Sequence, residues 1–441
     1  MQGLILSAYP HLDVAAYLLY RIDDADATRQ WLRHIVDRVT PGLNNKNADT
    51  DLNINIALSH TGLEKLVDVT GQAAGSFASP FAEGMAGRAH RSRILGDTGP
   101  SDPRRWEWGG VRNPVDLLLM VFARNEEGLA EAVAIAGPPA AALPPVAALP
   151  SLSLKEAGNT EHFGFRDGIS QPILTGTPDA ERYPESKNLT QLGEIVFGYP
   201  DGNDEIARGP SLHDNPDFGR NGTHLVFRQL DQDVAAFWNV MCEKTTVGGK
   251  ADLEAARQLA SKIVGRNRDG TPLVPRVNRE DNEFDFTGDR HGYGCPIGAH
   301  IRRSNPRNSF ADAPGAPLSA NRHRVVRRGR SYGDKLPAEA CGVRDDGERR
   351  GLLFLCLNAD LERQFEFINQ NWVNNSGFLG LAGERDPLVG DRPADGRTRF
   401  TVPGLPAPSR IHGLPRFVTV RGGEYFFLPG LRALRYLGGA R

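Results

Sequence analysis

Three short segments, far apart in the chain, carry the side chains with the clearest capacity for chemistry. Asp167 stands in Gly-Phe-Arg-Asp-Gly at Gly164–Gly168, His300 follows Cys-Pro-Ile-Gly-Ala, and Arg327 stands in His-Arg-Val-Val-Arg-Arg-Gly. A carboxylate can accept and return a proton, an imidazole can ligate a metal, and a guanidinium can stabilise an anion. Together the three side chains could form one acid–base, metal-ligand and anion-stabilising site.

Each of the three residues also has an ordinary structural explanation. The Asp-Gly pair could form a simple turn, a buried histidine is often satisfied by the backbone, and Arg327 could form a surface ion pair. If the last segment is a strand, Arg328 points to the opposite face, so the functional arginine could be displaced by one residue. The alternative metal ligands are His323 and His291.

The bulk composition is that of an ordinary globular protein. The chain has 441 residues and a formal net charge of -2, so it is long enough for two domains and is not a polyanion binder as a whole. The cysteines are scattered and form no Cys-x-x-Cys pair, which argues against a zinc site, a disulfide framework and covalent c-type haem attachment. They are Cys242, Cys295, Cys341 and Cys356.

The apolar segments give no sign of a membrane protein. No stretch is long and apolar enough to span a bilayer, and the N-terminal segment Met1–Ser7 lacks a basic region. We interpret this segment as a strand of the mature fold rather than a signal peptide. We therefore expect a cytoplasmic protein with no membrane partner.

Basic residues are concentrated between residues 301 and 330, where eight arginines face one acidic residue, Asp312. Such a cluster can bind nucleic acid, but it can equally hold carboxylates. Aromatic side chains are almost absent from the segment, so the stacking surface of a single-strand binder is missing. We expect no nucleic-acid partner.

Hydrophobic periodicity predicts two similar cycles of strands and helices. Strand patterns occupy 17–20, 52–58, 117–123, 224–230 and 352–357, and helical patterns occupy 28–39, 128–136, 234–241, 253–264 and 361–372. The segment 137–150 is interpreted as a surface connection, and 417–420 with 425–428 as a hairpin around Gly422 and Gly423. The order strand, helix, strand, strand, helix indicates an α+β fold with antiparallel sheets.

The motifs around the three reactive residues strongly resemble those of the dye-decolorizing peroxidase family. The resemblance rests on 161–172, 295–307 and 324–333, with further matches at 351–357 and 365–372, and it runs from near residue 3 to near residue 435. It implies two ferredoxin-like domains, 1–220 with the Gly-x-x-Asp-Gly loop and 221–441, around one non-covalent haem b per chain. The C-terminal domain would hold most of the haem.

The resemblance also implies a role for each residue. His300 would be the proximal ligand of the haem iron, Asp167 the distal acid–base and Arg327 the stabiliser of the peroxide anion. Because the ordinary pKa of an aspartate is about 4, activity is expected to fall as the pH rises above neutral, unless burial raises the pKa of Asp167.

Further residues around the haem follow from the same resemblance. Leu352 and Phe354 would form an apolar wall over the iron, and Arg303, with Arg307 as a weaker candidate, would bind a propionate. A carboxylate behind the histidine is expected. Asp360 is the first choice by position, although a helix N-cap explains it nearly as well. The other candidates for this carboxylate are Glu366 and Asp386.

The function implied is a peroxidase that reduces hydrogen peroxide and oxidises phenols, dyes or other bulky donors through a ferryl intermediate. The alternative is a haem carrier or iron-release protein with little turnover, which needs His300 but neither Asp167 nor Arg327. A third possibility is a cofactor-free α+β binding module. Trp372 or Tyr332 could pass electrons to bulky donors, although both fit ordinary core positions. The chain could be a monomer or a homodimer.

Overall fold

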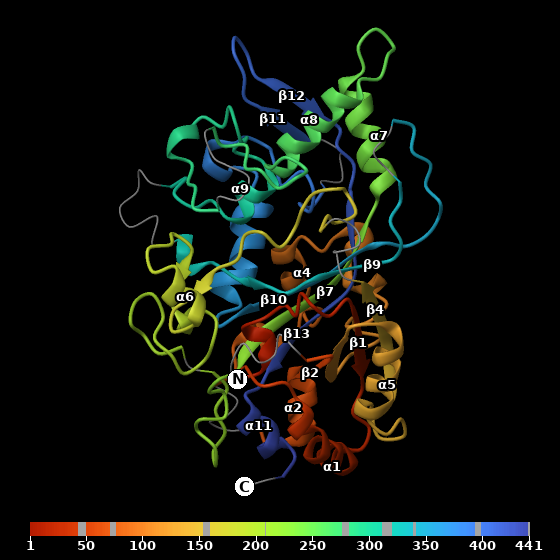
Figure 1. The fold of residues 1–441 in the computed structure, drawn as a ribbon, viewed down its shortest axis with the longest axis vertical. Helices are drawn as coiled ribbons and strands as arrows, with labels where there is room; N and C mark the ends of the chain where they lie inside the picture. Colours follow the sequence, from red (N-terminus) through yellow and green to blue (C-terminus); the bar gives the residue numbers. More distant parts are fainter. Residues whose placement is uncertain are drawn as a thin grey trace.

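The computed structural model of the protein describes residues 1–42, 50–70, 76–152, 159–207, 209–275, 282–310, 320–337, 341–392 and 398–439. Strands from both halves of the chain meet in the middle of the molecule (Figure 1). Helices α1, α2, α5 and α11 lie at one end, and α7 and α8 lie at the other. No helix in these ranges is long and apolar enough to cross a bilayer.

The N-terminal half forms one four-stranded antiparallel sheet with the order β2-β3-β1-β4. Its elements are β1 (Val14–Tyr20), α1 (Ala25–Ile35), β2 (Leu52–Leu58), β3 (Leu117–Ala123), α5 (Glu126–Ala136) and β4 (Pro145–Leu152). The chain order strand, helix, strand, strand, helix, strand with this pairing is the ferredoxin-like arrangement.

The C-terminal half repeats the arrangement with the order β13-β7-β10, and β8 and β9 both pair with β10. Its strands are β7 (Thr223–Gln232), β8 (Val326–Arg327), β9 (Arg330–Tyr332), β10 (Gly351–Asn358) and β13 (Val418–Leu428). Its helices are α7 (Val234–Thr245), α8 (Leu253–Val264) and the π-helices η9 (Glu362–Glu366) and η10 (Ile368–Val373). The prediction of an α+β fold with antiparallel sheets is confirmed.

Short elements connect these sheets. The helices are α2 (His60–Leu66), α3 (Ser79–Glu83), α4 (Ala89–Leu95), α6 (Pro178–Arg182), α9 (His300–Ser304) and α11 (Leu431–Leu437). The strands are β5 (Ile173–Leu174), β6 (Leu189–Thr190), β11 (Arg399–Val402) and β12 (Ser409–His412). The 3₁₀ turns are η1 (Gly3–Ile5), η2 (Val36–Arg38), η5 (Gly99–Ser101), η6 (Pro103–Arg105), η7 (Leu192–Glu194), η8 (Thr287–Asp289) and η11 (Phe378–Gly380).

The two sheets join at both edges. Leu152 of β4 pairs with Ser331 of β9, and Leu58 of β2 pairs with Phe427 of β13. The inner faces of both sheets enclose one core, to which Tyr17 of β1 and Leu353, Leu355 and Leu357 of β10 contribute. The division at residue 220 stays a prediction, because α11 from the C-terminal end packs on α1 of the N-terminal half.

Burial on both faces explains the continuous apolar run of β3. All seven residues of β3 are buried, because successive side chains point alternately to two different cores. Leu118 and Met120 lie in the core between the sheets, whereas Leu117 and Leu119 contact the core under the outer helices.

Three predictions of local structure were wrong. The segment Met1–Ser7 contains the 3₁₀ turn η1 rather than a strand, with the Gly3 amide bound to the Thr40 carbonyl. The segment 137–150 is not wholly a connection, because β4 begins at Pro145. Prolines are tolerated in β4 because only one of its residues pairs with β9, so the strand is largely an edge.

The predicted hairpin around Gly422 is a single strand, β13, with a bulge between Val420 and Gly422. A side chain at Gly422 would lie 2.4 Å from the indole of Trp108, so the glycine is required by close packing and not by a reversal of the chain. A glycine inside a strand can mark a bulge or a close approach as well as a turn.

A disulfide joins Cys242 of α7 to Cys341, which contradicts the prediction of no disulfide framework. The two cysteines are 99 residues apart, so their spacing carries no motif and only the fold brings them together. Asn239 reinforces the link, because its side chain accepts hydrogen bonds from the amides of Gly342 and Val343. Cys295 and Cys356 are buried free thiols.

Replacing both Cys242 and Cys341 by serine is expected to lower the free energy of unfolding by about 2–4 kcal/mol, because the unfolded chain loses a long cross-link. Urea unfolding of both proteins measures the difference. A reducing agent should destabilise the natural chain and leave the double variant unchanged. Equal stability of the two proteins under oxidising conditions would contradict the cross-link.

Candidate functional site

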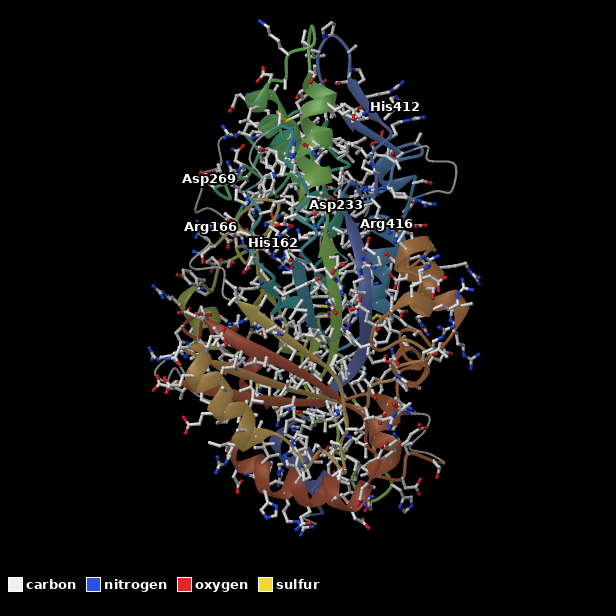
Figure 2. All side chains as sticks on the ribbon, turned by 90° about the vertical axis from the view of Figure 1, so that its right-hand side faces the viewer. His162, Arg166, Asp233, Asp269, His412 and Arg416 are labelled. Atoms are coloured by element: carbon white, nitrogen blue, oxygen red, sulfur yellow. A yellow bond between two sulfur atoms is a disulfide. The ribbon has the colours of Figure 1, made fainter. Side chains whose placement is uncertain are left out.

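A cavity of about 360 Å³ brings the three reactive residues together. His300, the first residue of α9, Asp167, from the loop after β4, and Arg327, from β8, all line it. Leu352 and Phe354 of β10 line it as well, since residues two apart on a strand share a face. Two further lining residues, Arg166 and Arg416, are labelled at mid-height of the molecule in Figure 2.

Asp167 and Arg327 form a direct ion pair at the cavity wall. Asp167 Oδ1 lies 2.9 Å from Arg327 Nη1 and also accepts a 2.6 Å hydrogen bond from the Gly168 amide. Arg327 is held in turn by the Ser170 carbonyl, 3.3 Å from Nη2, and by Gln171 Oε1, 3.0 Å from the Arg327 amide. Both charged groups therefore have fixed positions.

The ion pair sets the protonation state of Asp167. Burial raises the pKa of this carboxyl, but the charge of Arg327 and the hydrogen bonds lower it by more, so the pKa lies below its ordinary value. The carboxylate is therefore ionised at neutral pH and ready to accept a proton. Activity was expected to fall above neutral pH unless burial raised the pKa of Asp167. Because the net shift of this pKa is downward, that exception does not apply.

The adjacent arginine points elsewhere. Arg328 donates hydrogen bonds of 2.8 Å from Nε to the Leu4 carbonyl and 2.8 Å from Nη2 to the Ile5 carbonyl. It ties the N-terminal turn to the sheet, whereas Arg327 faces the cavity, as the alternation of side chains along a strand requires.

His300 is oriented by a buried carboxylate. Its Nδ1 lies 2.9 Å from Oδ2 of Asp386, whose other oxygen accepts the amides of Leu388 and Val389 at 2.9 Å each. Burial lowers the pKa of His300, and Asp386 raises it by more, so the net pKa lies above its ordinary value. In the described part of the chain Nε2 has no partner, and 30% of the side chain remains accessible, facing the cavity.

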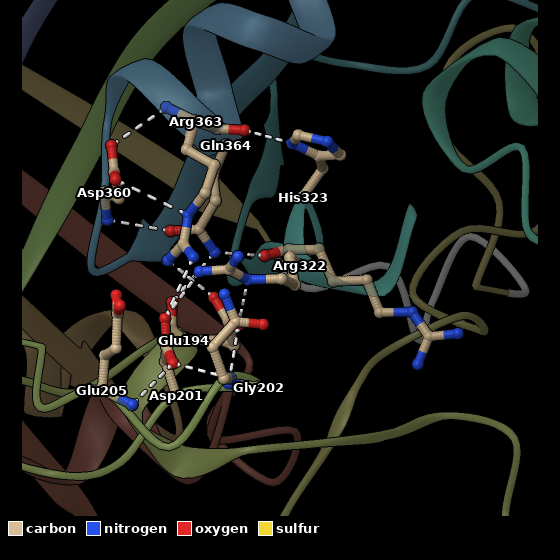
Figure 3. A network of polar contacts seen from close by, with 11 residues as sticks. Glu194, Asp201, Gly202, Glu205, Arg322, His323, Asp360, Arg363 and Gln364 are labelled. Carbon is tan, nitrogen blue, oxygen red and sulfur yellow. Dashed lines mark hydrogen bonds and ion pairs between the residues drawn. The ribbon is translucent and has the colours of Figure 1, made fainter. Parts of the chain in front are cut away.

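Asp386 and not Asp360 is thus the carboxylate behind His300. Asp360 caps the helical segment after β10, because its Oδ1 accepts the Arg363 amide at 2.9 Å. Figure 3 shows it in a separate polar network in which Arg322 and Arg363 contact Glu194 and Asp201. The third candidate, Glu366, is engaged by Arg91 and Tyr425.

Arg303, the predicted propionate ligand, lies outside the cavity lining. Its side chain is fully buried and donates to the carbonyl groups of Trp372 at 2.6 Å, Asn375 at 3.1 Å and Glu384 at 2.7 Å. Through these hydrogen bonds the guanidinium holds the backbone at 372–375 and at Glu384 against α9. Three residues after His300 on a short helix, it turns away from the cavity that His300 faces.

Four other arginines line the cavity without forming an ion pair to any described residue: Arg166, Arg266, Arg307 and Arg324. Burial lowers the pKa values of Arg266, Arg307 and Arg324 to about 10, 9 and 10, respectively. Arg324 Nε is buried and has no partner in the described part of the chain. A bound group with carboxylates would supply the missing negative charge. Arg307 was the weaker candidate from sequence, and no motif marked Arg266.

The lining fits the haem b that the sequence resemblance implies. It combines an imidazole nitrogen without a partner, cationic side chains without anions, and apolar walls suited to a macrocycle. Trp372 is also part of this lining and is buried. The arginines of the segment 301–330 that the structure describes are directed into the cavity or into internal hydrogen bonds.

Known proteins of similar sequence point to one family. The chain is 34% identical over 299 residues to a dye-decolorizing peroxidase of Mycetinis scorodonius, covering 62% of this chain and 56% of that protein. It is 31% identical over 405 residues to a multifunctional dye peroxidase of Amycolatopsis sp., covering 80% and 82%. A deferrochelatase of Yersinia pestis is 31% identical over 255 residues, covering 57% and 46%. No protein-family model matches the chain.

Solved structures agree with these relatives. An ancestral D-type dye-decolorizing peroxidase superposes with a TM-score of 0.82 at 27% identity, over 100% of this chain and 98% of that one. A decolorizing peroxidase of Auricularia auricula-judae gives a TM-score of 0.79 at 26% identity, over 99% and 98%.

Replacing Arg327 by leucine is expected to raise the pKa of Asp167 by about one to three pH units, because the nearest opposite charge is lost. An NMR titration of labelled aspartate carboxyl groups in cofactor-free protein measures it. Arg324→Leu removes a guanidinium from the same cavity without touching Asp167 and serves as the control. An unchanged pKa in Arg327→Leu would show that the ion pair does not hold Asp167 ionised.

Proposed function

Because the chain belongs to the dye-decolorizing peroxidase family, we propose that it is a haem peroxidase that reduces hydrogen peroxide and oxidises phenols, dyes or similarly bulky donors. The observation that carries this proposal is the Asp167–Arg327 ion pair in the same cavity as His300. A proton acceptor and an anion stabiliser beside a metal-ligand candidate are the groups that peroxide cleavage needs.

We infer one non-covalent haem b per chain. His300 would hold the iron through Nε2, since Asp386 occupies Nδ1 and fixes the ring. Arg266, Arg307 and Arg324 would hold the propionates, and Leu352 and Phe354 would form the apolar wall. Two cysteines are joined in a disulfide and the two free ones are not among the lining residues, so no thiol is placed for covalent attachment. When bound, the haem supplies the redox-active iron at which the peroxide bond is cleaved.

Asp167 and Arg327 would divide the work on the peroxide. The ionised Asp167 carboxylate takes the proton from one peroxide oxygen and returns it to the other, which leaves as water. Arg327 stabilises the negative charge that develops between these events. The same guanidinium keeps Asp167 ionised, so a single ion pair prepares the base and the anion site together.

A haem carrier or iron-release protein is the alternative, and a deferrochelatase is among the relatives. Such a protein needs a haem ligand but no proton shuttle. The ordered hydrogen bonds around Asp167 and Arg327 therefore favour the peroxidase.

The cellular location and the oligomeric state stay predictions. A cytoplasmic location was expected, yet a disulfide such as Cys242–Cys341 is typical of oxidising compartments and argues against it. Phenols and dyes as donors are proposed on family grounds.

Asp167→Asn and Arg327→Leu are each expected to lower peroxide-dependent turnover by about 100- to 10,000-fold with haem bound, since proton transfer loses its base or its charge partner. Absorbance of an oxidised phenol measures turnover, and the haem spectrum measures occupancy. Asp179→Asn, on the exposed helix α6, should keep full activity.

Three outcomes would contradict the proposal. Full turnover in both variants with haem bound would remove the two residues from the mechanism. Haem uptake by the natural chain without turnover would favour the carrier. A folded but colourless protein after expression with ample haem would favour a cofactor-free module.

A further inference from the structure

The loop that presents Asp167 has little regular structure of its own. It follows β4, and the structure describes it from Asn159 through the Gly-Phe-Arg-Asp-Gly motif. His162, which precedes this motif, and Arg166, which lies within it, are labelled in Figure 2. A loop without a ladder of strand or helix hydrogen bonds must satisfy its backbone amides in another way.

The carboxylate of Glu161 satisfies two of these amides, and backbone carbonyls accept others, such as the Asn159 carbonyl, which accepts the Asp167 amide at 3.2 Å. Its Oε2 accepts the Phe163 amide at 2.9 Å, and its Oε1 accepts the Phe165 amide at 2.9 Å. The backbone of Glu161 closes the same turn, because its amide donates to the Phe165 carbonyl at 2.9 Å and its carbonyl accepts the Gly164 amide at 2.8 Å. One residue therefore makes four hydrogen bonds to the segment just before Asp167.

Glu161 is itself tied to the sheet. Gln232, the last residue of β7, donates from Nε2 to Glu161 Oε2 at 2.7 Å. The neighbouring rings of Phe163 and Phe165 are buried, and Phe163 packs 4.6 Å from Phe237 of α7. The carboxylate thus connects the rigid end of β7 to a loop whose aromatic side chains are already fixed in a core.

We propose that Glu161 is a positioning residue that sets Asp167 against Arg327. Asp167 lies two residues beyond Phe165, and the 2.9 Å contact with Arg327 depends on where the turn ends. Loss of the Glu161 carboxylate leaves two amides without acceptors, and displacement of a catalytic group by about 1 Å costs about 100-fold in rate. The effect on turnover rests on the proposed function, whereas the hold on the loop does not.

Hydrogen exchange tests the hold on the loop without using activity. In Glu161→Ala, the amides of Phe163 and Phe165 should exchange about 10- to 100-fold faster than in the natural chain, because a hydrogen bond to a charged acceptor is lost at each. Gln232→Ala should give a smaller increase, since only the tie to β7 is removed. Asp116→Asn is the matched control, because it removes a buried carboxylate that accepts the Ile22 amide in the other sheet.

The pH profile separates positioning from a simple effect of charge. A pure effect of charge would lower the pKa of Asp167, because a nearby negative charge is lost. The acid limb, the fall of turnover at low pH as Asp167 becomes protonated, would then move to lower pH by the same amount in Glu161→Gln and Glu161→Ala. Positioning predicts the opposite direction, an acid limb at higher pH, larger in Glu161→Ala than in Glu161→Gln. Asp116→Asn should keep the natural profile.

Each result decides the matter. Unchanged exchange of the Phe163 and Phe165 amides in folded Glu161→Ala would overturn the proposal, as would equal acid limbs shifted to lower pH. If Glu161→Ala does not fold, Glu161→Gln and Gln232→Ala give the same tests. A natural chain without turnover would defeat the proposed function alone, because the exchange of the loop amides would still report on Glu161.

Discussion

The pairing of β10 with β7 on one side and with β8 on the other is the constraint on which the site depends. It sets Leu352 and Phe354 on one face of β10 and places Arg327 of β8 opposite Cys356. It also fixes the end of β7, from which Gln232 reaches the loop of Asp167. Because hydrogen-bonded strands hold their register closely, three walls of the cavity are built on one rigid scaffold.

Charge compensation inside this scaffold is selective. Asp167 is paired with Arg327, and His300 with Asp386, so each reactive group has a partner that fixes its geometry and its pKa. Arg266, Arg307 and Arg324 have no such partner among the described residues, although burial of an unpaired charge is costly. In the proposed function, Arg266, Arg307 and Arg324 would pair with the carboxylates of the bound group.

The sequence was most informative where the signal is local. Periodic hydrophobic patterns located β2 and α8 correctly, and a continuous apolar run located β3, which is buried on both faces. It failed where a local signal had two explanations. Gly422 was interpreted as a turn residue although Trp108 requires it, and Asp360 was ranked first although capping accounts for it.

The sequence by itself determined the family and the two strand–helix cycles, and it predicted Asp167, His300 and Arg327 as site residues, since each lies in a motif whose residues are contiguous. Only the tertiary structure decided which carboxylate supports His300, which arginines face the cavity and which cysteines are joined. Asp386 is 86 residues from His300, and Cys341 is 99 residues from Cys242. A contact between distant segments depends on the packing of whole sheets, and no local spacing records it.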